Sequence, residues 1–236
     1  NRAGFRKLPG TALKNEQTGE TVYTPPQHHE EIIALMTNLE QFINDDELCD
    51  WDPLTKMAVI HHQFESIHPF YDGNGRTGRI INILYLVKQR LLSVPVLYLS
   101  RYINQHKADY YRLLQAVRVG DAWQEWVLYM LEGIEQTSRQ TIVLIQGIKE
   151  LMQHHKHKLR GELPKIYSQD LINNIFRHPY TKIEFVMTEL QVSRITATRY
   201  LNELTRIGLM TKYRLGRDNY YVNDALYTLL GNTNAH

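Results

Sequence analysis

Apolar residues recur at helical spacing over much of the chain. In the segments 32–43, 54–64 and 80–87 they fall three or four residues apart, so one face of each segment is apolar. Asp52, followed by a proline, predicts the start of the second helix, and Pro69 predicts its end. The pattern therefore predicts a mainly α-helical protein.

The next part of the chain continues the helical pattern. Asp121, with a glutamine three residues later, predicts the capped start of a helix. A separate, long amphipathic helix is expected over about 135–157. Gly161 and Pro164 then mark a domain boundary.

Two segments depart from this pattern. Residues 11–24 hold two short runs around a polar centre at 15–19, which is typical of an exposed β-hairpin. After the boundary the elements become short, and three helices followed by a hairpin form the order of a winged helix-turn-helix domain. These elements are expected at 168–176, 181–189, 193–207 and around 216–218. The first domain is expected at 1–135 and includes the hairpin at about 8–25. A connecting helix is expected at 136–163, and the winged helix-turn-helix domain at 164–236.

The composition is that of an ordinary folded protein. Hydrophobic residues make up 43% and charged residues 22%. No run approaches the ~18 apolar residues that a membrane-spanning helix needs. The lone cysteine, Cys49, excludes an intrachain disulfide and fits a reducing compartment. We therefore expect a cytoplasmic protein with no membrane partner.

The net charge of +2 hides an asymmetry along the chain. Residues 193–217 hold six basic side chains and one acidic side chain, so this stretch carries +5 and the rest carries −3. Arg194 and Arg199 lie near the start of the helix that would read DNA in a winged helix. A basic patch confined to one module predicts a duplex DNA partner, with dimerisation or protein docking as the alternative.

The residues with the clearest chemistry lie between the second and third predicted helices. Gly73 and Gly75 flank Asn74, so the backbone can turn and converge its N–H groups on an anion at a helix start. Arg76 and Arg79 share a face of that helix. Two guanidinium groups beside such a nest suit a polyphosphate.

Two further side chains complete this stretch. Asp72 beside phosphates predicts a bridging cation, and Mg²⁺ binds through one or two carboxylates plus substrate phosphates. His68, at the end of the preceding helix, can accept a proton near neutral pH. The alternatives are a simple hairpin turn, which the helical flanks disfavour, and a His68 that merely ends a helix.

The stretch His68–Arg79 resembles the Fic (Fido) motif HxFxDGNGRxxR, with every specified position filled. The resemblance extends from the hairpin to about Glu135. It implies a Fic-type helical core with a β-hairpin flap, here followed by a small winged-helix domain. It also implies transfer of AMP from ATP to a Ser, Thr or Tyr hydroxyl of a target protein that docks at the flap.

The resemblance implies a role for each motif residue. His68 would be the general base, Asp72 would hold Mg²⁺, and Arg76 would neutralise the leaving diphosphate. Arg79 would meet the γ-phosphate, and Gly73, Asn74 and Gly75 would cradle phosphate oxygens. Tyr110 and Tyr111 match positions where the family often lines the nucleotide pocket, although helix-core packing is an equal alternative for both.

Many Fic proteins also carry an inhibitory helix with the pattern [S/T]xxxE[G/N]. Glu132 is the only glutamate followed by glycine or asparagine, but Leu128 occupies the position four residues earlier, so the pattern fails. We expect such a helix upstream of Asn1, which would make this form deregulated.

Two function hypotheses follow from these patterns. The first is an ATP-dependent protein adenylyltransferase with His68 as base. The second is a winged-helix DNA-binding regulator whose Fic core only senses nucleotide, and the two roles can coexist. Modification of the chain itself and a homodimer stay open.

Overall fold

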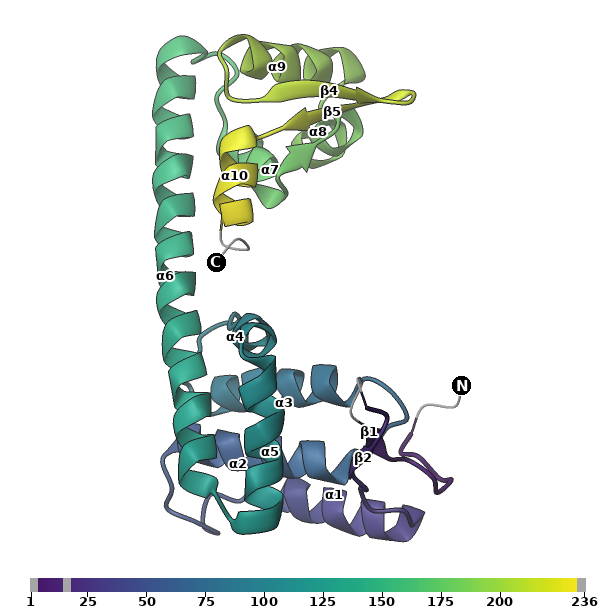
Figure 1. Cartoon of the computed structure of the whole chain (residues 1–236). Coiled ribbons are helices and arrows are strands. Elements are labelled where there is room, and N and C mark those ends of the chain that lie inside the picture. The colour runs from purple at the N-terminus through teal and green to yellow at the C-terminus, as the bar shows by residue number, and fades with distance from the viewer. Residues whose placement is uncertain (1–3, 15–17, 233–236) are drawn as a thin grey trace. The chain divides into compact units, whose positions relative to one another are not determined.

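The computed structural model describes residues 4–14 and 18–232 (Figure 1). Contacts divide the chain into two compact units, Asn1–Thr141 and Ile142–His236. Each unit has its own hydrophobic core. Within the described residues, no helix combines the length and apolar character needed to cross a membrane.

The first unit is a set of helices with a small hairpin. Helix α2 is its centre, because Met57, Ile60, Phe64 and Ile67 are all buried. Asp52 caps this helix by accepting a hydrogen bond from the Leu54 N–H (2.8 Å), as its sequence predicts. The helices of this unit are α1 (His29–Asn44), α2 (Pro53–Ile67), α3 (Asn74–Lys88), α4 (Leu99–Gln105), α5 (Lys107–Gly120) and the first part of α6 (Trp123–Glu162).

The expected hairpin is present. Strands β1 (Leu13–Lys14) and β2 (Thr21–Tyr23) pair antiparallel, with Leu13 opposite Tyr23. The polar turn at 15–17 lies outside the described residues. The Tyr23 hydroxyl donates to the Ser66 carbonyl (3.0 Å), so the hairpin is fixed beside the end of α2 (Figure 1).

Helices α2 and α3 approach closely where α3 has a glycine. A Cβ atom on Gly78 would lie 3.0 Å from Glu65 Oε1 and 3.1 Å from Phe64 Cδ1. It would also lie 3.2 Å from His61 Cε1. Glycine at this position therefore lets α3 pack close to α2. This close packing places the loop that joins the two helices near the buried end of α2.

The prediction of two helices between 121 and 157 was wrong. One helix, α6, runs from Trp123 to Glu162, and Asp121 instead ends α5 in the left-handed conformation (φ 52°). Gly133 lies within α6, and the Tyr102 ring packs where a side chain would be, 2.5 Å from an ideal Cβ.

The second unit begins with the end of α6, whose Leu159 is buried in the second core. Ser168 and Ser193 cap their helices by accepting hydrogen bonds from the N–H groups of Leu171 and Thr196. The sequence analysis did not find β3 or α10. The elements are α7 (Gln169–Arg177), β3 (Tyr180–Thr181), α8 (Ile183–Leu190), α9 (Arg194–Arg206), β4 (Thr211–Leu215), β5 (Asp218–Val222) and α10 (Asp224–Asn232).

The three short strands form one antiparallel sheet in the order β3-β5-β4. Tyr221 of β5 is buried against the helices, so its neighbours Tyr220 and Val222 face the other side of the sheet. Assignment of this unit as a winged helix, and the domain boundaries at 135 and 163, stay predictions.

The packing of α2 on α3 gives a stability prediction. Gly78→Ala is expected to lower the free energy of unfolding of the first unit by about 1–3 kcal/mol, because the added methyl overpacks the helix contact. Gly120→Ala is the matched control: its Cβ would meet nothing within 4 Å. Urea unfolding followed by tryptophan fluorescence measures both, since Trp51, Trp123 and Trp126 all belong to this unit. Equal midpoints for the two variants would contradict the prediction.

Candidate active site

His68 lies at the end of α2 in a left-handed backbone conformation, with φ 50° and ψ 57°. Its N–H still donates to the Phe64 carbonyl (3.0 Å), and Pro69 prevents the helix from continuing. A non-glycine residue in this conformation costs about 1 kcal/mol. The surrounding contacts must therefore hold the turn in place.

The surroundings of His68 keep its imidazole neutral. Burial lowers the pKa of His68 below its usual range, and the charges of Arg6 and Arg118 lower that pKa further, although the Glu65 carbonyl opposes this. Nδ1 is buried, and the Glu65 carbonyl is the backbone acceptor that acts on the ring. At pH 7 the ring is thus an uncharged imidazole, which is the form that accepts a proton.

The loop after His68 is closed by Asn74, the first residue of α3. The Phe70 N–H donates to Asn74 Oδ1 (2.9 Å), and Asn74 Nδ2 donates to the Phe70 carbonyl (2.8 Å). This buried side chain is therefore fully used in shaping the loop. Sequence reasoning placed Asn74 at the site but did not predict this structural use.

The start of α3 offers backbone N–H groups to an anion. Gly73 adopts φ 84°, which a side chain would disfavour, and the first helical bond runs from the Thr77 N–H to the Gly73 carbonyl (2.9 Å). Helix geometry therefore leaves the N–H groups of Asn74, Gly75 and Arg76 without an intrahelical acceptor. Together with the helix dipole, these N–H groups are suited to bind an anion.

Asp72 and Arg76 are exposed and pair with each other. Arg76 Nη2 lies 3.3 Å from Asp72 Oδ2, and the two side chains are 73% and 92% exposed. Exposed ion pairs of this kind contribute little stability. Both groups are therefore free to exchange this contact for a phosphate or a cation.

Arg79 lies along the first turn of α3 beside a buried carboxyl group. A Cβ on Gly75 would lie 3.2 Å from Arg79 Nη1 and 3.7 Å from Glu65 Oε1. Burial raises the pKa of Glu65 to about 7, and the charges of Arg79 and Arg118 act in the opposite direction. The sequence analysis did not find Glu65, although a charged residue three positions before His68 on a helix with a largely apolar face was a usable signal.

The two predicted nucleotide-pocket tyrosines have different environments. Tyr110 is buried, and its hydroxyl lies 2.9 Å from Nε2 of the buried His61. It therefore packs in the helix core. Tyr111 is 55% exposed, and its contact with a nucleotide stays a prediction.

In the second unit the predicted DNA-reading arginines lie on α9. Arg194 is paired with Glu184 (3.1 Å), whereas Arg199 is exposed and stacks over Tyr200 at 5.6 Å. Ile195 beside them is 83% exposed. Within the described residues, α9 thus presents Arg199, in its second turn, without an ion-pair partner, and it exposes the apolar side chain of Ile195.

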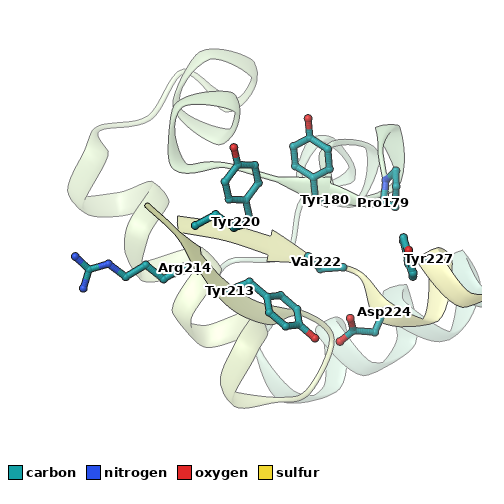
Figure 2. Close-up of a pocket in the computed structure, with 9 residues that line it drawn as sticks. Pro179, Tyr180, Tyr213, Arg214, Tyr220, Val222, Asp224 and Tyr227 are labelled. Atoms are coloured by element: carbon teal, nitrogen blue, oxygen red, sulfur yellow. The ribbon is translucent and has the colours of Figure 1, made fainter. Parts of the chain in front are cut away.

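The second unit also has a groove of about 790 Å³ on the outer face of its sheet. Figure 2 shows Tyr180 and Tyr220 on the same side of the sheet, with ring centroids 5.5 Å apart, and Asp224 near Tyr213. Four of the nine lining residues are tyrosines, and the lining holds a single cation, Arg214. It therefore does not resemble a phosphate site.

Both units match described families. Residues 2–86 match the Fic/DOC family, and residues 151–226 match the C-terminal domain of SoFic-like protein adenylyltransferases. A solved structure of a Fic family protein from Desulfovibrio desulfuricans G20 shares the fold, with TM-score 0.51 and 22% identity. The match covers 93% of this chain and 62% of the chain in that structure.

Curated relatives match part of the chain. The protein adenylyltransferase fic-1 of Caenorhabditis briggsae is 28% identical over 117 residues, or 50% of this chain and 22% of that protein. The protein adenylyltransferase Fic of Aedes aegypti is 29% identical over 130 residues, or 55% of this chain and 24% of that protein. The chain thus matches less than a quarter of the length of these relatives.

The buried Glu65 gives a pH prediction. Its pKa is raised in the fold from 4.5 to about 7, so the folded state binds the extra proton and stability falls as the pH rises through that window. Relative to Glu65→Gln, the wild-type free energy of unfolding should fall by about 2–3 kcal/mol between pH 4.5 and 7. Urea unfolding at several pH values measures this. If the free energies of unfolding of the two proteins changed in parallel with pH, folding would not raise the pKa of Glu65, and the prediction would be wrong.

Proposed function

We propose that this chain, which carries a Fic-family domain followed by a SoFic-like C-terminal domain, transfers AMP from ATP to a hydroxyl side chain of a target protein. The observation that carries the proposal is the juxtaposition at the end of α2. His68 is neutral, and a short loop joins it to the start of α3. That helix start has free N–H groups and two arginines. A base beside a polyphosphate site is what nucleotidyl transfer requires.

In the proposed reaction, His68 accepts the proton of the target Ser, Thr or Tyr hydroxyl. Because Nδ1 is buried, Nε2 is the nitrogen that meets this hydroxyl. The hydroxyl oxygen then forms a bond to the α-phosphorus, and the bond from that phosphorus to the β-phosphate oxygen breaks. Diphosphate leaves, and its charge is offset by Arg76, Arg79 and the N–H groups at the start of α3.

Asp72 is the residue that would hold Mg²⁺. No group of three or more metal-ligating side chains occurs in the part of the chain that the structure describes. One exposed carboxylate nevertheless suits Mg²⁺, which keeps several waters and takes phosphate oxygens as ligands. When bound, the ion would neutralise phosphate charge next to Arg76.

The β1–β2 hairpin is the proposed docking site for the target. It is a two-stranded sheet, so a strand of the target can pair with an open edge. Its end at Tyr23 is fixed to Ser66, two residues before His68. A target segment held on the hairpin would therefore lie near the base. A cytoplasmic location with its supply of ATP fits this activity.

A second function, duplex DNA binding by the C-terminal unit, is favoured by the α9 surface. The first two turns of this Ser193-capped helix present Ile195 and Arg199 to solvent within a stretch of charge +5. We propose that this unit is a winged helix that places the enzyme on DNA. A regulator whose core only senses nucleotide is the alternative, and homodimer formation stays a prediction.

The transfer reaction has a direct test. Incubation with α-labelled ATP and Mg²⁺ should label a protein in a soluble extract, or the chain itself. His68→Ala should abolish this labelling, at least ~100-fold, because general base catalysis is lost. His154→Ala, an exposed histidine on α6, is the matched control and should label normally. Label arriving only from γ-labelled ATP would show phosphotransfer and contradict the proposal.

DNA binding has a separate test. The full chain should bind duplex DNA with an affinity that falls steeply with salt, and Arg199→Ala should reduce the slope of log K against log salt by about 1. Arg139→Ala, which removes an exposed arginine outside the basic stretch, should leave the slope unchanged. Fluorescence anisotropy measures both. Absence of binding at low salt would end this proposal.

A further inference from the structure

Arg6 is completely buried and reaches the turn that holds His68, 62 residues away in the sequence. Its Nε donates to the His68 carbonyl (2.9 Å), and its Nη2 donates to the carbonyls of Ile67 (3.4 Å) and Pro26. The Arg6 backbone N–H donates to the Pro69 carbonyl (2.8 Å). One residue thus holds the three consecutive carbonyl groups from Ile67 to Pro69.

The hydrogen-bond acceptors of this arginine are carbonyl oxygens, bound through Nε and Nη2, while Nη1 is buried without a partner among the described residues. Among the described residues, no carboxylate lies within 4 Å of its guanidinium group, and Glu31 acts on it only from a greater distance. Carbonyl groups at the end of α2 carry partial negative charge, because helix geometry leaves them without N–H partners. A planar fork of donors can bind several of them at once, which an ammonium group cannot do as well.

The residues around Arg6 attach the same segment to the loop on the far side of His68. The N–H groups of Lys7 and Leu8 both donate to the Tyr71 hydroxyl, at 2.9 and 3.0 Å. The Phe5 ring packs on the Phe70 ring at 5.6 Å. The segment 5–8 therefore holds the chain immediately before, at and after His68.

We propose that Arg6 is a positioning residue for the AMP transfer proposed above, acting by holding His68 in its left-handed conformation. The backbone angles of His68 set the direction of its Cα–Cβ bond and hence where the imidazole lies. Without the Arg6 fork, nothing else among the described hydrogen bonds holds the His68 carbonyl, and the residue can relax to a conformation of lower energy. A displacement of about 1 Å at a reacting group can cost ~100-fold in rate.

The test compares Arg6→Gln and Arg6→Lys with the control Arg112→Gln, an exposed arginine paired with Asp109. Arg6→Gln should lower kcat for label transfer by about 30- to 100-fold while the KM for ATP changes less than about threefold, because the phosphate-binding groups on α3 are untouched. Arg6→Lys should recover part of kcat, since it can still reach one or two of the carbonyls. The control should match the wild type.

Hydrogen exchange supplies a readout that does not need activity. The amides of His68 and of residues 70–72 should exchange faster in Arg6→Gln than in the control, while the amides of α5 exchange equally in both. Loss of kcat in proportion to the unfolded fraction, or equal kcat for Arg6→Gln and Arg6→Lys, would overturn the positioning role. Absence of transfer by the wild type would overturn the proposed function instead, and the exchange comparison would then decide whether Arg6 holds the turn.

Discussion

The site depends on where and how helix α2 ends. At Ile67 the apolar face of α2 is fully buried, and one residue later the chain must leave the core to reach α3. His68 makes that exit through a left-handed turn, which costs free energy at a non-glycine residue. The carbonyl groups exposed by the turn are bound by the Arg6 guanidinium group. The position of the imidazole follows from this one backbone conformation.

The charged groups around the turn form two sets, one buried and one exposed. Arg6, Arg118 and Glu65 are wholly or largely buried around His68, and they affect the protonation of groups at the site. Asp72 and Arg76 are exposed and only loosely paired, so they can rearrange around a ligand. The buried set thus sets the charge state of the His68 ring, and the exposed set keeps the freedom to rearrange that the proposed phosphate and cation contacts require.

The sequence predicted the helices that have strong local signals. Asp52 before proline, the helices that begin near 168 and 193, and the hairpin at 11–24 all rest on interactions between residues close in the chain. It failed at α6, where Asp121 resembles a cap but instead ends α5, and it did not find β3, whose two residues pair only with distant β5. Short sequence patterns do not indicate contacts between residues that lie far apart in the chain.

The same limit applied at the site. The motif residues from His68 to Arg79 could be read from the sequence because they are consecutive, but the residues that hold them come from elsewhere in the chain. Arg6 and Arg118 approach His68 from the N-terminal segment and from α5, and no spacing rule connects them to it. Tyr110 was equally compatible with a pocket or a core until its contact with His61 placed it in the core.

The central claim is that the fold keeps His68 neutral, with Nε2 available to accept a proton. Nuclear magnetic resonance of the labelled histidine rings, followed as a function of pH, measures both the charge and the tautomer. The account predicts that His68 titrates below its usual range and is protonated on Nδ1 alone at pH 7. A His68 ring that is charged at pH 7, or that has its proton on Nε2, would contradict the account.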